Sequence, residues 1–118
     1  SDRVFSIAGR TSLAGLAALS RHCDCMVSCD TGPMLLCSAA GAPIVVLHGP
    51  TAWTHKPLGP TDVVICKHLP CSPCLTVYNQ KCAPCVHGAN LCMQQISVDE
   101  VLEAVRRVLE GAGARAPR

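Results

Sequence analysis

The most constraining feature of the sequence is a short apolar run, residues 25–29, that ends abruptly in the motif Asp-Thr-Gly-Pro at residues 30–33. The run has the length and composition of a strand covered on both faces of a parallel sheet. The segment 34–41 that follows is rich in helix formers and small residues, and it closes with a glycine suited to the position after a helix. Pro33 fits the first helical turn, where a missing N–H costs nothing. We therefore predict a strand, a tight turn and a helix in that order.

A turn of this kind has two interpretations that the residues alone leave open. In open α/β folds, backbone N–H groups at a helix start point toward the carboxyl edge of the sheet, where phosphates bind. The N–H groups of Thr31, Gly32 and Met34, with the Thr31 hydroxyl, would then form an anion site. Alternatively, Asp30 or Thr31 only caps the helix, and Gly32 only permits the bend.

The rest of the chain alternates strands and helices, which implies right-handed parallel crossovers. We expect a strand end at 4–8, a helix from Thr11 or Ser12 to about Ser20, strands at about 24–29, 43–48 and 62–66, and helices at about 33–41 and 98–109. The sequence therefore predicts an α/β fold with a partial Rossmann-like parallel sheet, flanking helices and a cysteine-rich loop.

The last predicted helix has its own start signal and a predicted buried face. Ser97 and Glu100 have the spacing of a capping box. The apolar stripe expected to face the core consists of Val98, Val101, Leu102, Val105 and Leu109. Residues 111–118, rich in glycine and alanine, are expected to be a disordered tail.

Composition limits the class of protein. The 118 residues suffice for one domain, with 49% hydrophobic but only 3% aromatic residues, a balance that suits parallel α/β packing. A net charge of +2 without a basic run argues against nucleic acid as a partner. The sequence shows neither an apolar stretch of about 20 residues nor the pattern of a signal peptide.

Ten cysteines fall into two groups. Cys23, Cys25, Cys29 and Cys37 lie in or beside predicted elements, where cysteine serves as a small buried hydrophobe. The second group lies in a loop and comprises Cys66, Cys71, Cys74, Cys82, Cys85 and Cys92. This loop contains two Cys-x-x-Cys pairs, and four thiolates can hold zinc or an iron–sulfur cluster. Spacing alone favours the ligand set Cys71, Cys74, Cys82 and Cys85. His68 and His87 are alternative fourth ligands, and disulfides are the competing explanation.

Three stretches together resemble one family. The run DTGPMLLCSAAGAPIVVLHGPT, residues 30–51, is similar to the nucleotide-binding stretch of glycosyltransferase family 9, the heptosyltransferases. Residues 9–13, Gly-Arg-Thr-Ser-Leu, resemble the family's Gly-x-Thr-Ser-Leu, and the cysteines between 71 and 92 resemble a pattern found in many members. The resemblance extends over roughly residues 4–109.

The resemblance implies a domain organisation. Residues 1–110 correspond to the C-terminal part of the donor-binding domain of a GT-B glycosyltransferase, with residues 66–92 as a cysteine-rich insert and residues 111–118 as the tail. The acceptor domain and the start of the donor domain are missing from this correspondence. Either the chain is a fragment of a longer protein, or a partner domain or a second copy is expected to complete its sheet.

The resemblance also implies a function and a set of site residues. The chain would bind a nucleotide sugar such as ADP-heptose, for transfer to a glycan or lipid-linked acceptor in lipopolysaccharide or related glycan synthesis, in the cytoplasm at the inner face of the bacterial membrane. The binding positions implied are Thr11, Ser12, Asp30, Thr31, Gly32, Pro33, Met34, Gly49 and Thr51. Asp30 would orient the turn or accept a hydrogen bond from a sugar hydroxyl. The family pattern selects Cys71, Cys74, Cys85 and Cys92 as metal ligands, with Cys82 as an alternate.

Two departures from the family pattern bear on activity. Leu35 stands where the family has a histidine, and His48 stands where it has an aromatic residue before Gly-Pro-Thr. The family's general base lies in the acceptor domain, so we assign no catalytic residue to this chain. A second hypothesis is therefore retained: a non-catalytic metal-binding scaffold or interaction module built on the same fold.

Overall fold

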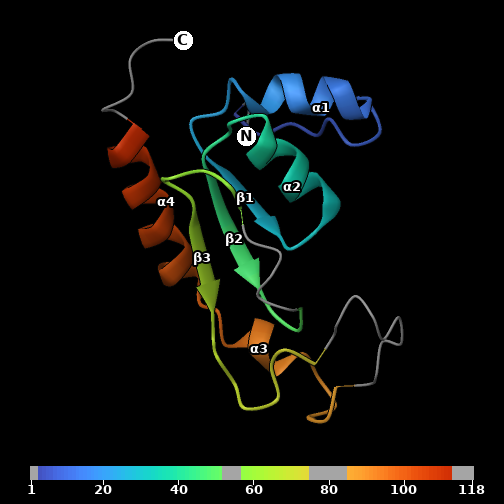
Figure 1. Cartoon of the computed structure of the whole chain (residues 1–118), viewed down its shortest axis with the longest axis vertical. Coiled ribbons are helices and arrows are strands. Elements are labelled where there is room, and N and C mark those ends of the chain that lie inside the picture. The colour runs from blue at the N-terminus through green and yellow to red at the C-terminus, as the bar shows by residue number, and fades with distance from the viewer. Residues whose placement is uncertain (1–2, 52–56, 75–84, 113–118) are drawn as a thin grey trace.

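In a computed structural model, which describes residues 3–51, 57–74 and 85–112, the chain forms a parallel sheet with helices on both faces (Figure 1). The elements in chain order are α1 (Leu13–Ser20), β1 (Met26–Cys29), α2 (Gly32–Ala39), β2 (Ile44–His48), β3 (Val63–Cys66), α3 (Leu91–Gln94) and α4 (Val98–Ala112). The sheet has three strands in the order β1-β2-β3, and each strand is parallel to its neighbour. This architecture confirms the predicted α/β class and the partial Rossmann-like sheet.

The core lies on both faces of β2, as expected for a central parallel strand. Successive side chains of a strand point to opposite faces, so the apolar residues of β2 serve two clusters. Ile44 and Val46 pack with residues of α2, whereas Val45 packs with residues of α4. The buried members of the two clusters are Met34, Cys37, Ala42, Ile44 and Val46 on one face, and Val45, Ala104 and Val108 on the other. Figure 1 shows α1 and α2 on one side of the sheet and α4 on the other.

The helix boundaries follow the local signals in the sequence. Ser12 is the N-cap of α1, and its Oγ accepts a hydrogen bond from the N–H of Gly15 at 3.0 Å. The capping box before α4 is also confirmed: Glu100 N donates to Ser97 Oγ at 3.2 Å, and Ser97 N donates to Glu100 Oε2 at 2.8 Å. Gly41, the residue after the C-cap of α2, has φ 87°, a left-handed conformation that favours glycine.

Glu100 also links α4 to the sheet. Its carboxylate forms an ion pair with Lys67, the residue that follows β3. Hydrogen bonds from the Lys67 ammonium and from the backbone of Ser97 lower the pKa of Glu100 to about 2. The carboxylate therefore stays ionised at neutral and mildly acidic pH, and the capping box keeps its charge.

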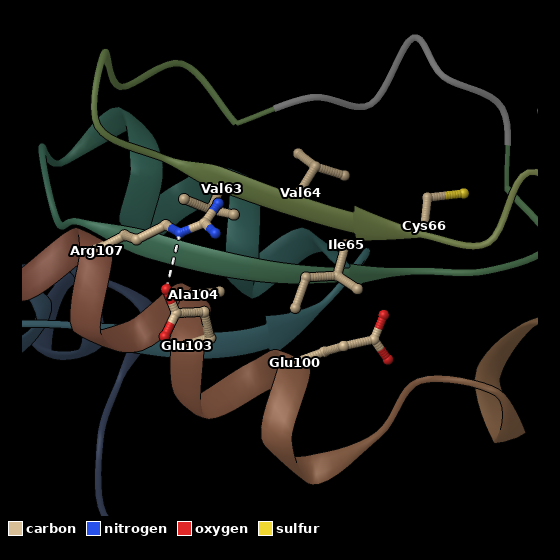
Figure 2. Close-up of a pocket in the computed structure, with 8 residues that line it drawn as sticks. All are labelled: Val63, Val64, Ile65, Cys66, Glu100, Glu103, Ala104 and Arg107. Carbon is tan, nitrogen blue, oxygen red and sulfur yellow. Dashed lines mark hydrogen bonds and ion pairs between the residues drawn. The ribbon is translucent and has the colours of Figure 1, made fainter.

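A groove of about 320 Å³ lies between β3 and the exposed side of α4, and Figure 2 shows its lining. Its walls combine apolar side chains of β3 with charged side chains of α4: Val63, Val64, Ile65, Cys66, Glu100, Glu103, Ala104 and Arg107. The charged groups are already engaged, because Glu103 Oε1 lies 3.2 Å from Arg107 Nε and Glu100 pairs with Lys67. These contacts stabilise α4 and its packing on the sheet, so the groove is not our candidate site.

Several expectations about the elements were wrong. Residues 4–8 form no strand, and Val4 and Phe5 are about four-fifths exposed, because no described strand lies beside them to pair with. Helix α4 continues through Gly111 and Ala112, two residues we had assigned to the tail, whereas residues 113–118 lie outside the described part of the chain. The short helix α3 was not predicted at all.

The predicted buried stripe of α4 was only partly right. Val105 packs against the core, but Val98, Leu102 and Leu109 are 74%, 47% and 43% exposed. The helix buries Ala104 and Val108 instead, because the small side chain of alanine permits close approach to Val45 of the sheet.

The interpretation of the first cysteine group also needs a correction. Cys37 is fully buried and Cys25 packs against the core, as expected for small hydrophobes, but Cys29 is exposed at the end of the edge strand β1. Burial raises the pKa of the Cys25 thiol. These cysteines are free thiols in the structure.

Asp62 is a structural centre at the amino ends of β2 and β3. Its Oδ1 accepts a hydrogen bond from the N–H of Ile44 at 3.0 Å, and its Oδ2 accepts from Gly59 N at 2.8 Å and from Ser38 Oγ at 3.2 Å. Ser38 Oγ in turn accepts from Leu58 N at 2.6 Å. One carboxylate therefore joins α2, the start of β2 and the turn before β3.

Candidate anion-binding site at the carboxyl edge of the sheet

A pocket of about 260 Å³ lies where β1 ends and α2 begins, next to the segment that follows β2. Its lining residues are Asp30, Thr31, Gly32, Leu35 and Thr51. Four of them belong to the binding positions that the family resemblance implies, and the fifth, Leu35, is the departure from the family histidine. The structure thus brings together residues from two consecutive strand ends at the carboxyl edge of the sheet, the edge where open α/β folds bind ligands.

The start of α2 presents backbone donors to this pocket. The N-cap, Thr31, has an extended backbone, and its side chain makes no capping hydrogen bond, since its hydroxyl donates to the Cys29 carbonyl at 3.4 Å. No described residue accepts a hydrogen bond from the N–H of Thr31, Gly32 or Met34. The first turn of α2 also carries no acidic residue. The positive end of this helix dipole therefore remains open to an anion.

The residues beyond the turn contribute in different ways. Met34 is fully buried in the core, so only its backbone N–H can serve the pocket. Pro33, in the first turn, is exposed and offers no N–H. Leu35 lines the pocket and is 38% exposed, so it borders the helix start without closing it from solvent.

A buried ionisable pair stands at one wall of the site, where Asp30 lines the pocket and His48 lies behind it. His48 Nε2, at the end of β2, lies 3.4 Å from Asp30 Oδ2, and the two side chains are 1% and 7% exposed. The sequence did not predict this pair, because it identified His48 only as a replacement for the family's aromatic residue. The strand register is the signal that would have found it: Cys29 pairs with Leu47, so the next residues along each strand are neighbours.

Thr51 supplies a second polar group. Its Oγ1 is buried and has no hydrogen-bond partner among residues 3–51, 57–74 and 85–112. Buried hydroxyl groups are normally hydrogen-bonded, and Thr51 also lines the pocket. This hydroxyl is therefore placed to serve a ligand.

Besides Pro33 and Met34, three of the implied binding positions are not among the lining residues of the pocket. Thr11 and Ser12 are exposed, and Ser12 caps α1. Gly49 is buried beneath α3, where a Cβ atom would come within 2.5 Å of Met93 Sδ. The lack of a side chain at Gly49 thus permits close packing of α3 against the end of β2.

The cysteine-rich segment supports the turn that leads to Thr51. Ser72 Oγ donates to the Gly49 carbonyl at 2.7 Å, and Cys74 N donates to the Pro50 carbonyl at 2.9 Å. These two bonds join the segment to the residues between β2 and the pocket. The segment therefore helps to position one wall of the site.

The cysteines of this segment show one contact typical of a ligand pair. Cys71 Sγ lies 3.5 Å from His87 Nε2, whereas Cys85 Sγ donates to the Ala89 carbonyl at 2.7 Å. Cys92 is buried, and burial raises the pKa of its thiol. Among the residues that the structure describes, no group of three or more His, Cys, Asp or Glu side chains is arranged to hold a metal ion. Cys82, the alternate ligand, lies outside the described residues.

Comparison with known proteins gives a consistent assignment. The family model of glycosyltransferase family 9 (heptosyltransferase) matches residues 1–84. Lipooligosaccharide heptosyltransferase 2 of Campylobacter jejuni subsp. jejuni serotype O:2 is 26% identical over 93% of this chain, and the protein of that name from serotype O:6 is 25% identical over 90%. The chain spans about a third of the length of these relatives, 33% and 32%. No solved structure matches the chain.

The fold and the site define a Rossmann-like α/β unit with an open helix start at the carboxyl edge of its sheet. Because the family model covers well over half of its residues, the chain belongs to glycosyltransferase family 9. Within the described part of the chain, no helix has the length and hydropathy that crossing a membrane requires.

Proposed function

We propose that this chain is the nucleotide-sugar-binding portion of a heptosyltransferase-like enzyme, and that its pocket holds the diphosphate of an ADP-sugar. The observation that carries the proposal is the uncapped start of α2, which opens into a pocket of about 260 Å³. The membership in glycosyltransferase family 9 supports a sugar nucleotide as the anion. By analogy with the named relatives, the product would be a lipooligosaccharide or a related glycan.

The chemistry of the pocket suits a diphosphate leaving group. When the bond from the sugar to the diphosphate breaks, negative charge grows on the diphosphate oxygens. Preorganised N–H groups of Thr31, Gly32 and Met34 would stabilise this charge, and the Thr51 hydroxyl would add a further donor. Asp30 would accept a hydrogen bond from a sugar hydroxyl, since its own charge disfavours close contact with phosphate.

The acceptor and the group that activates it belong to other parts of such an enzyme. Among the described residues, β1 and β3 are the two edges of the sheet, and Val27 of β1 is 50% exposed. We also propose that a further domain, or a second copy of the chain, adds a strand beside β1. The glycan or lipid-linked acceptor would bind outside the part of the chain described here.

Calorimetric titration with ADP and with adenosine tests the proposed site. We expect ADP to bind at least about tenfold more tightly than adenosine, because charge-assisted hydrogen bonds contribute roughly 1.5–3 kcal/mol each. Circular dichroism on the same sample shows that the chain is folded. Equal affinities, or no binding of ADP at millimolar concentration by a folded chain, would contradict the diphosphate assignment.

A second candidate function is metal binding by the cysteine-rich segment, with zinc or an iron–sulfur cluster held by Cys71, Cys74, Cys85 and Cys92. The contact between Cys71 and His87, an alternative fourth ligand, favours metal binding, because thiolate and imidazole are both common ligands of zinc. Elemental analysis of protein purified under reducing conditions is the test. We expect stoichiometric zinc or iron that is lost in Cys74→Ser and kept in Cys29→Ser, a matched exposed cysteine outside the segment. Purified protein without metal would contradict this second function, and the cysteine-rich segment would then only support the turn after β2.

A further inference from the structure

We infer that His48 is a positioning residue: it fixes the Asp30 carboxylate in the pocket wall so that this carboxylate can recognise a hydroxyl group of the sugar. The inference rests on the proposed function, because it assumes that the pocket holds a nucleotide sugar. It adds to that function the role of His48, which acts through Asp30 to favour the sugar nucleotide over the nucleotide alone.

The two side chains come from adjacent strands at one level of the sheet. The register that pairs Cys29 with Leu47 places Asp30 beside His48. His48 Nε2 lies 3.4 Å from Asp30 Oδ2, and the imidazole is 1% exposed. By strand alternation, His48 shares the face of Ile44 and Val46, so its ring is anchored in the apolar layer beneath α2.

Asp30 differs from His48 in that it also lines the pocket. Its side chain is 7% exposed, and it lines the cavity together with Thr31 and Gly32. A buried carboxylate is costly unless another group compensates its charge. The His48 ring lies 3.4 Å from this carboxylate on its core side, and its position there restricts rotation of the carboxylate.

The site therefore has two functional parts. The N–H groups at the start of α2 would bind the diphosphate, whereas Asp30, oriented by His48, would accept a hydrogen bond from a sugar hydroxyl. A phenylalanine at position 48 would fill the same apolar space but would place no polar nitrogen beside the Asp30 carboxylate. Replacing His48 should thus affect the recognition of the sugar more than the affinity for ADP.

The experiment measures the preference of the whole chain for ADP-heptose over ADP, as the ratio of the two calorimetric dissociation constants. We expect His48→Phe and Asp30→Ala each to reduce this ratio about tenfold, the effect of one charge-assisted hydrogen bond, with a much smaller change for ADP itself. His48→Gln, whose amide can donate from nearly the same position, should restore part of the preference. His22→Phe, at an exposed histidine, is the matched control and should leave the ratio unchanged.

The outcomes separate the inference from the function on which it rests. If a folded wild-type chain binds no ADP, the proposed function fails, and the inference is overturned with it. If ADP binds but ADP-heptose binds no more tightly, or the preference survives in His48→Phe, the diphosphate site stands and the role of His48 is overturned. Should His48→Phe not fold, His48→Asn replaces it, since its shorter amide cannot reach Asp30; an unchanged preference there also overturns the inference.

Discussion

Replacing Asp62 with alanine is expected to lower the free energy of unfolding by about 3–5 kcal/mol, because each donor left without a partner costs roughly 1–3 kcal/mol. Asp62 accepts hydrogen bonds from Ile44 N, Gly59 N and Ser38 Oγ. The stability of a domain of this size is only about 5–15 kcal/mol, so the variant should lose much of its folded population. Urea unfolding followed by circular dichroism measures the change.

Two variants give this prediction its controls. Asp24→Ala removes an exposed carboxylate before β1 and should change stability by less than about 0.5 kcal/mol. Asp62→Asn keeps one acceptor oxygen and nearly the same shape, so its effect should lie between those of wild type and Asp62→Ala. If Asp62→Ala and Asp24→Ala unfold at the same urea concentration as wild type, the carboxylate does not join α2 to the sheet as described.

Leu35→Glu is expected to weaken ADP binding by roughly 10- to 100-fold, because a carboxylate about 5 Å from a phosphate costs a few kcal/mol in a partly shielded pocket. Leu35 lines the pocket at the start of α2 and is 38% exposed, so the longer polar side chain can be accommodated without disrupting the core. The added charge also lies at the point where the helix would stabilise the diphosphate. Calorimetry with ADP gives the ratio of affinities.

Leu35→Gln is the matched control, since it has the shape of the glutamate without its charge. We expect it to lose much less affinity than Leu35→Glu, and the difference should shrink at high salt. Leu13→Glu adds the same charge on α1, where the side chain is 72% exposed and distant in sequence from the pocket. If glutamate and glutamine at position 35 weaken ADP equally, or neither does, the pocket is not where the phosphates bind.

The parts of the fold that could be predicted are those encoded by local signals. The apolar run before the Asp-Thr-Gly-Pro motif and Pro33 predicted β1 and α2. Likewise, Ser97 and Glu100 predicted the start of α4, because a capping box depends only on residues three apart. The end of β1 and the start of α2 at the pocket could be predicted for the same reason, because they are consecutive in the sequence.

The parts that could not be predicted depend on which elements become neighbours. The Asp30–His48 pair follows from the register of two strands, and the Asp62 hydrogen bonds join segments 18 and 24 residues apart in the chain. Residues 4–8 have the composition of a strand, but a strand also needs a partner to pair with. Helix α4 carries more apolar residues than the sheet can cover, and the close fit of Ala104 selected the buried face.

The most direct test of the central claim is the response of individual backbone amides to ADP, measured by two-dimensional NMR of the ¹⁵N-labelled chain. We expect the largest shifts at Thr31, Gly32 and Met34, whose N–H groups have no acceptor among the described residues. The amide of Gly88, in the cysteine-rich segment, should remain unchanged. Shifts concentrated away from the start of α2, or no shifts in a folded sample saturated with ADP, would contradict a diphosphate site at this helix.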